Sequence, residues 1–229
     1  MKIIEPSVEL MRDFDGAEIM KFIERCGRIA YQSEKNITAD SAEKFVRNLI
    51  KRGHESVLEH FSVTFKIICD RGVMAEITRH RLASYTIEST RFNNYNSSKN
   101  GFEISVMYPF QQIPDDTFLP FLDWKRSMED AEKSYMRLTS KGIKPEIARA
   151  VLPNSLKTEI VMTCNLREWR TILKLRTAKD AHPQMRQVAN MILAILKEKL
   201  PIIFEDIDVL NDFDSVTIKG GLVFEEVGT

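Results

Sequence analysis

Hydrophobic positions along the chain follow two different periods, and each period predicts one kind of secondary structure. Apolar side chains recur at three- and four-residue spacing over residues 16–31 and again over residues 39–51, which indicates two early helices. Thr38 stands before the second of them as a candidate helix cap. Residues 61–67 alternate between apolar and polar, as in a half-buried strand, and residues 72–82 return to helical spacing. The first third of the chain therefore predicts helices and strand together.

The rest of the chain continues this mixture of periods. The further predicted elements are an opening strand over 8–11, helices over 118–140 and 145–151, a strand over 158–163, and helices over 167–174 and 184–199. Residues 93–101 are rich in asparagine and serine and short of apolar anchors, so they predict a loop. The acidic region 206–214 leads to a candidate hairpin around Gly220.

Length and charge narrow the class of protein. The 229 residues are enough for one well-buried core, so we expect a single domain over residues 1–229. Lysine plus arginine number 33, as do aspartate plus glutamate, so there is no global positive field to draw the chain onto nucleic acid or a membrane. No apolar run approaches the roughly 20 residues that span a bilayer, and the first residues lack a signal-peptide pattern. We therefore expect a cytoplasmic protein.

The cysteines and glycines argue against several kinds of site. Cys26, Cys69 and Cys164 lie among apolar neighbours without metal-type spacing, so we expect buried thiols, no disulfide framework and no metal. None of the nine glycines belongs to a GxGxxG arrangement. Any dinucleotide must therefore bind in another way.

Residues 79–91 form the densest polar motif of the chain, with three arginines, a histidine, a glutamate and two serines. Each guanidinium offers a planar fork of donors that matches phosphate oxygens. Arg79 and Arg81 alone could decorate the end of a helix, where cations interact favourably with its dipole. The motif follows the apolar residues 73–77, however, and a basic group beside a core is a better site candidate than one on a solvated face. The motif therefore indicates a nucleotide site.

Three blocks, in order, resemble one known family. The motif Arg79-His80-Arg81, followed by Ser89 and Arg91, is similar to the signature of the flavin-dependent thymidylate synthases, the ThyX family. The other similar blocks are residues 53–60 upstream, and Asn165-Leu166-Arg167, Leu175-Arg176 and His182-Pro183-Gln184 downstream. The resemblance spans about residues 1–206, which leaves residues 206–229 as a tail without an assigned role.

The resemblance implies a fold and a reaction. The fold would be an α+β domain with a central, mainly antiparallel sheet flanked by helices, and the mixed periods agree with it. NADPH would reduce FAD, methylenetetrahydrofolate would supply a one-carbon unit, and dUMP would become dTMP without a cysteine nucleophile. Several subunits of a homotetramer would build each site.

The resemblance also implies roles for individual residues. Arg176 would be catalytic, because a guanidinium beside the uracil ring stabilises the ionised form of the base. The substrate-binding residues would be Glu76, Arg79, Glu88, Ser89, Thr90, Arg91, Arg149 and Arg176. The flavin-binding residues would be His54, Ser56, Glu59, Arg79, His80, Arg81, Asn165, Arg167, Thr171 and His182. Ser89 has no dedicated histidine–acid pair around it, so we interpret it as a hydrogen-bonding group rather than a nucleophile.

Some positions depart from the family pattern. Glu76 stands where many members have glutamine, Ser56 replaces a common threonine, and Thr171 replaces an asparagine. Glu88 lies one residue later than the acid of other members. His60 is interpreted as structural, as a lone histidine usually is.

Two other functions remain compatible with these residues. One is an NADPH-dependent flavoprotein reductase without the methyl-transfer reaction. The other is an RNA- or DNA-binding module built on residues 79–91, which would bind polynucleotides in a salt-dependent manner.

Overall fold

The computed structural model describes residues 1–109 and 117–208, so the candidate hairpin around Gly220 lies outside the described residues. The chain divides into two compact units. Unit 1 comprises Met1–Ser7, Ile67–Arg79 and Tyr85–Val161. Unit 2 comprises Val8–Lys66, His80–Ser84 and the residues from Met162 onward.

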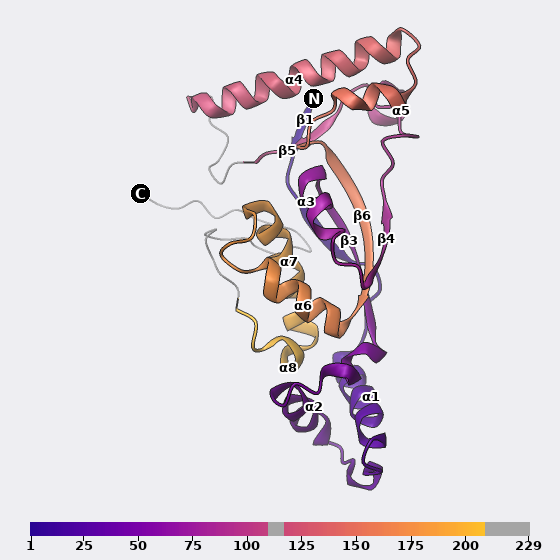
Figure 1. Ribbon diagram of the computed structural model, residues 1–229, viewed down its shortest axis with the longest axis vertical. Helices are drawn as coiled ribbons and strands as arrows, with labels where there is room; N and C mark the ends of the chain where they lie inside the picture. Colours follow the sequence, from indigo (N-terminus) through magenta and orange to yellow (C-terminus); the bar gives the residue numbers. More distant parts are fainter. Residues whose placement is uncertain (110–116, 209–229) are drawn as a thin grey trace. The chain divides into compact units, whose positions relative to one another are not determined.

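A four-stranded sheet has the order β2-β3-β6-β4, and Figure 1 shows β3, β6 and β4 side by side. The strands are β2 (Ser7–Leu10), β3 (Ser62–Asp70), β6 (Lys157–Asn165) and β4 (Ala83–Ile87). Backbone bonds join Leu166 to Phe61 (N–O distance 3.0 Å) and Arg71 to Asn154 (3.0 Å), so the partner numbers fall along β6 as they rise along β3. The β3–β6 pair is therefore antiparallel.

Alternate side chains of β3 and β6 are buried, as the period of two requires of strands with one face on a core. In β6 the buried residues are Thr158, Ile160, Met162 and Cys164, and in β3 they are Val63, Phe65, Ile67 and Cys69.

Unit 1 has its own hydrophobic core. Its elements are β1 (Lys2–Ile4), α3 (Arg71–Ile77), η3 (Ser98–Asn100), β5 (Ser105–Met107), α4 (Leu119–Ser140), α5 (Pro145–Ala148) and η4 (Arg149–Val151). Strand β1 pairs in parallel with β5. The core contains Tyr95, Ile104, Val106, Met128, Tyr135, Ala148 and Leu156.

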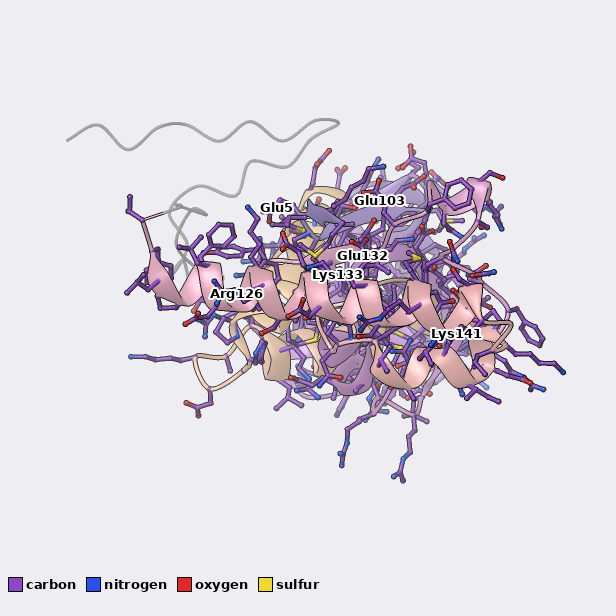
Figure 2. All side chains as sticks on the ribbon, turned by 90° about the horizontal axis from the view of Figure 1, so that it is seen from above. Glu5, Glu103, Arg126, Glu132, Lys133 and Lys141 are labelled. Carbon is purple, nitrogen blue, oxygen red and sulfur yellow. The ribbon has the colours of Figure 1, made fainter. Side chains whose placement is uncertain are left out.

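Helix α4 is amphipathic. Met128 and Tyr135, seven residues apart, face the core, and the ring of Tyr135 meets that of Tyr95 edge-on with 5.6 Å between centroids. Arg126 and Lys133 are exposed along the same helix, and the exposed Lys141 follows its last residue (Figure 2).

Unit 2 is mostly helical. Its elements besides strand are α1 (Gly16–Ile29), η1 (Glu34–Asn36), α2 (Ser41–Lys51), η2 (Glu55–His60), α6 (Leu166–Arg176), α7 (Pro183–Lys199) and α8 (Pro201–Phe204). Helices α1 and α2 are joined through the buried Glu24, which accepts hydrogen bonds from Arg28 (2.6 Å) and from the Ser41 hydroxyl (2.8 Å). Trp169 of α6 is fully buried and donates its indole N–H to the Val63 carbonyl (3.1 Å).

Most predicted elements are confirmed, with ends shifted by a few residues. The opening strand, both early helices, the strand at 61–67 and the later helices all form. The short strands β1, β4 and β5, and helix α8, were not predicted, because three to five residues carry too little periodicity. The mixture of helices with an antiparallel sheet agrees with the expected α+β class, whereas the single domain stays a prediction.

Three details of the predicted elements were wrong. The helix predicted over 72–82 ends at Ile77, where the Thr78 hydroxyl donates to the Met74 carbonyl (2.8 Å), and residues 83–87 form β4 instead. Thr38 is not the cap of α2, because the helix begins at Ser41 and Asp40 occupies the N-cap position without a side-chain hydrogen bond. The loop over 93–101 does have an apolar anchor, because Tyr95 is buried. No helix in the described ranges is long and apolar enough to cross a membrane.

Two glycines should respond differently to substitution. In Gly16→Ala the new methyl group would overlap the backbone carbonyl of Lys199, so we expect a loss of roughly 3 kcal/mol in the free energy of unfolding. Gly142 has a φ of 80° at the end of α4 and open space around it, so Gly142→Ala should cost only about 1 kcal/mol. Urea unfolding of both variants measures the difference, and equal losses would contradict the close packing at Gly16.

Candidate active site

The basic motif runs from the end of α3 through β4 into the loop that follows. Arg79 and Arg81 are exposed, whereas His80 between them is only 9% exposed. Arg79 and Ser89–Arg91 belong to unit 1, and His80 and Arg81 belong to unit 2. The motif therefore contributes to two groups of predicted site residues, one in each unit.

The first group lies in unit 1, where the end of the motif meets α5 and η4. Arg149 donates to the hydroxyl of the buried Thr90 (3.2 Å). Arg91 donates to Glu146 (3.1 Å), and the Ser89 hydroxyl accepts the backbone N–H of Arg91 (3.2 Å). Both arginines are exposed, so an anion can reach them. The structure thus brings together Ser89, Thr90, Arg91 and Arg149 from segments 58 or more residues apart.

Glu88 of the same group is engaged inside the protein. It accepts from Lys157 (2.9 Å) and from the hydroxyl of the buried Tyr95 (3.4 Å), and Lys157 also donates to Glu159 (2.5 Å). Burial lowers the pKa of Lys157, but the two carboxylates outweigh it and the net shift is upward. Burial, followed by the charge of Glu88, raises the pKa of Tyr95. The role of Glu88 toward a substrate stays a prediction.

Glu76 and Arg79 lie at the end of α3. Glu76 is half-buried, and its backbone carbonyl accepts the N–H of the exposed Arg79 (3.3 Å). Their predicted substrate contacts also stay predictions.

The second group lies in unit 2, where His80 and Arg176 are in contact. Arg176, the last residue of α6, donates its Nε–H to Nε2 of His80 (3.1 Å), and His80 Nδ1 lies 3.8 Å from a Glu168 carboxylate oxygen. Burial, and then the charge of Arg176, lowers the pKa of His80, while burial raises the pKa of Glu168. Because Nε2 accepts a bond, we assign a neutral imidazole with its proton on Nδ1.

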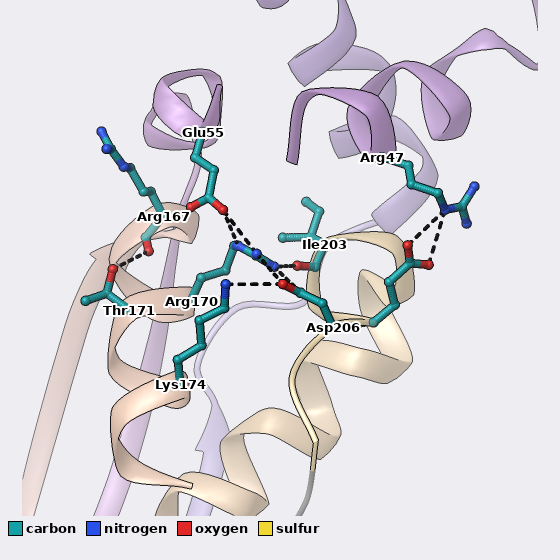
Figure 3. A network of polar contacts seen from close by, with 9 residues as sticks. Arg47, Glu55, Arg167, Arg170, Thr171, Lys174, Ile203 and Asp206 are labelled. Atoms are coloured by element: carbon teal, nitrogen blue, oxygen red, sulfur yellow. Dashed lines mark hydrogen bonds and ion pairs between the residues drawn. The ribbon is translucent and has the colours of Figure 1, made fainter. Parts of the chain in front are cut away.

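The upstream and downstream blocks also meet in unit 2. Arg167 of α6 forms an ion pair with Glu59 of η2 (2.5 Å), which joins two predicted flavin residues 108 positions apart. The Asn165 side chain caps α6 by accepting the Glu168 N–H (2.9 Å). Thr171, one turn after Arg167, donates to the Arg167 carbonyl (3.2 Å; Figure 3).

The remaining predicted flavin residues are exposed. His54 and Ser56 lie at the start of η2, Arg81 precedes β4, and His182 precedes α7. Their exposure makes them accessible to a ligand, and their flavin contacts stay predictions.

Some polar residues in these groups were not predicted. Lys157 partners Glu88, Glu168 faces His80, and Arg170 bonds Glu55. Arg170 could have been found, because helical spacing places it on the same face as Leu166 and Leu173, which are fully buried. An arginine on the apolar face of a helix predicts a buried ion pair.

The two buried thiols, Cys69 and Cys164, are not activated. All three cysteines are free, Cys69 and Cys164 are buried, and Cys26 is half-buried rather than buried as expected. Burial, and then Asp70, raises the pKa of Cys69 to about 12. Burial, and then Glu168, raises the pKa of Cys164. Thiolate nucleophiles require the opposite shift. Within residues 1–109 and 117–208 no group of three potential metal ligands occurs.

Comparison with known proteins assigns the class. Residues 13–202 match the family model described as thymidylate synthase complementing protein. A probable flavin-dependent thymidylate synthase from Mycobacterium phage L5 is 32% identical over 208 residues, which cover 85% of this chain and 82% of that protein. A flavin-dependent thymidylate synthase from Pyrococcus abyssi is 35% identical over 176 residues, covering 75% and 70%.

A solved structure agrees with these relatives. The UMP/dUMP methylase PolB from Streptomyces cacaoi, bound with 5-Br dUMP, superimposes with a TM-score of 0.74 at 25% identity. The match covers 90% of this chain and 96% of that one. The chain is therefore a member of the thymidylate synthase complementing class. It belongs to the flavin-dependent thymidylate synthase family.

The His80–Arg176 contact should be visible in the titration of His80. We expect a pKa below the ordinary value of 6.5 in the wild type, and a higher pKa in Arg176→Gln, because one of the two causes of the shift is removed. The chain has four histidines, so NMR titration of their ring signals can measure the His80 pKa in the wild type and in the variant. Arg167→Gln, on the same helix, is the control and should leave the His80 pKa unchanged. A wild-type pKa above 6.5 would contradict the contact.

Proposed function

We propose that this chain converts dUMP to dTMP with methylenetetrahydrofolate as one-carbon donor and NADPH-reduced FAD as hydride source. Family membership supports the reaction, and so does the structural similarity to PolB, which is a UMP/dUMP methylase. The observation that carries the proposal is the contact between Arg176 and the motif residue His80. It joins the downstream block to the basic motif in one place.

The residues of unit 2 fit a flavin dinucleotide. FAD carries a pyrophosphate and a planar ring with hydrogen-bonding edges, and unit 2 offers exposed cations at Arg81 and Arg167 and exposed polar groups at His54, Ser56 and His182. Glu59, His80, Asn165 and Thr171 complete the flavin residues proposed in unit 2, and Arg79 is the flavin residue proposed in unit 1. When bound and reduced by NADPH, FAD supplies the hydride. The protein residues bind and orient the cofactor.

Arg176 would activate the base. Its half-buried guanidinium is oriented by the bond to the neutral His80, so the side chain is held before substrate arrives. A cation beside the imide nitrogen and carbonyl of uracil stabilises the negative charge that makes carbon 5 nucleophilic. A buried thiol of raised pKa, such as that of Cys164, has no part in this step.

The residues of unit 1 would bind the nucleotide. Arg91 and Arg149 provide exposed guanidinium groups for the phosphate, and Ser89 and Thr90 provide hydroxyl groups beside them. Glu76, Arg79 and Glu88 would contact the rest of the substrate.

The assembly belongs to the same proposal. We propose a homotetramer in which subunits share sites, as the family resemblance implies, within a single domain per chain. Activity should then be lost on dilution below the tetramer's dissociation constant. The cytoplasmic location stays a prediction.

Tritium release tests the reaction. Protein supplied with FAD, NADPH, methylenetetrahydrofolate and dUMP labelled at carbon 5 should release tritium to water. Arg176→Ala should bind FAD yet lose at least a hundredfold in turnover, because the charge that activates the base is absent. Cys164→Ala is the control and should keep its turnover.

Two other outcomes would contradict the proposal. NADPH oxidation without tritium release would indicate a reductase. Salt-dependent polynucleotide binding without flavin would indicate a nucleic-acid-binding module.

The nucleotide role of unit 1 has its own test. Arg149→Gln should raise the KM for dUMP at least tenfold, because a charge-assisted phosphate contact is lost. Arg126→Gln, which removes an exposed arginine of α4, should leave the KM within twofold of the wild-type value. Equal KM values for the two variants would remove Arg149 from the substrate site.

A further inference from the structure

Arg170 is a buried cation whose hydrogen-bonding capacity is fully used. Its side chain is 1% exposed. Nε and Nη2 donate to one oxygen of Glu55 (3.3 and 3.1 Å), and Nη1 and Nη2 donate to the two oxygens of Asp206 (2.7 and 2.8 Å). Nη1 also donates to the Ile203 carbonyl (Figure 3). These five bonds match the five N–H groups of a guanidinium.

The network is balanced in charge. Lys174 adds a second cation, with its Nζ 3.2 Å from Asp206, so two cations face the two carboxylates of Glu55 and Asp206. The bond from Arg170 lowers the pKa of Asp206 to about 2 against the opposing effect of burial. Burial lowers the pKa of Arg170, but its carboxylate partners have the larger, opposite effect, so the net shift of the pKa is upward. Separating a buried charge from one of its partners is costly, because the charge is then left uncompensated. Arg170 therefore holds its carboxylate partners in a fixed geometry.

The network joins the elements that carry the proposed flavin residues. Glu55 is the first residue of η2, which also carries Ser56 and Glu59. Arg170 lies one turn from Arg167 on α6, and its neighbour Thr171 is exposed. One guanidinium therefore ties the upstream block to the downstream block.

A second ion pair joins the same two elements, but it should contribute less. Arg167 and Glu59 are 50% and 45% exposed, and exposed pairs contribute little because water and salt screen them. Glu55 is 21% exposed and its partner Arg170 is buried. The buried pair is therefore the one that fixes η2 against α6.

We propose that Arg170, through Glu55, is a positioning residue that sets the register of η2 against α6 and so shapes the flavin-binding surface. This inference rests on the proposed function. Arg170 itself contacts no cofactor, since all its N–H groups are bonded to protein.

The test is FAD titration of full-length variants at a temperature where circular dichroism shows an intact fold. Glu55→Ala should weaken FAD binding at least tenfold, whereas Glu55→Gln, which keeps an acceptor oxygen, should stay within threefold of the wild type. Glu205→Ala is the matched control, because it removes a carboxylate from the more exposed Arg47–Glu205 pair (2.9 Å; Figure 3 shows Arg47 near the end of α8). It should change FAD affinity less than twofold.

The outcomes separate the inference from the proposed function. A folded Glu55→Ala variant with wild-type FAD affinity would overturn the positioning role, whereas a wild type that does not bind FAD would overturn the proposed function. If Glu55→Ala does not fold, the Arg170→Lys variant tests the inference instead. Lysine keeps the positive charge but has three N–H donors in place of five, so FAD affinity should fall at least fivefold. An unchanged FAD affinity would overturn the inference.

Discussion

The antiparallel pairing of β3 with β6 is the constraint on which the candidate site depends. In such a pair, the segment before one strand lies beside the segment after the other. Leu166 bonds Phe61, and the Thr64 and Thr163 hydroxyls are 2.9 Å apart, so η2 and α6 must meet in unit 2. In unit 1 the same pairing brings Arg71 to Asn154. Blocks that are about 100 residues apart in sequence thereby become neighbours.

Burial then divides the arginines by role. Arg170 is buried and bonded on every N–H, so it holds structure together. Arg176 is half-buried and oriented by His80, which suits a charge that must act on a substrate without reorganising. Arg91, Arg149 and Arg167 are exposed, where they can exchange solvent for phosphate oxygens. In the proposed function the arginine side chain would thus serve three purposes, which differ in how accessible the side chain is to solvent.

Much of this was predictable from the sequence. Long periodic segments such as α4 and α7 were found, because their apolar stripes extend over several turns. The motif spacing identified the family. Glu59 and Arg167, which were assigned to one flavin set from distant blocks, form an ion pair, while their flavin contacts stay a prediction. The end of α3 at Ile77 was missed because the spacing of apolar residues continues to Leu82, while the pairing of β4 with β6 depends on tertiary contacts. Three pairs could not be read from spacing, because their members are 69 to 115 positions apart: Glu88 with Lys157, His80 with Arg176, and Arg170 with Glu55.

Hydrogen–deuterium exchange of the full chain, with and without FAD, tests most directly whether η2 and α6 form one flavin-binding surface. The account predicts that FAD slows amide exchange in residues 54–60 and in residues 165–176 together, because a ligand held by both segments stabilises both. Slower exchange in only one of these segments, or in neither while FAD is bound, would contradict it.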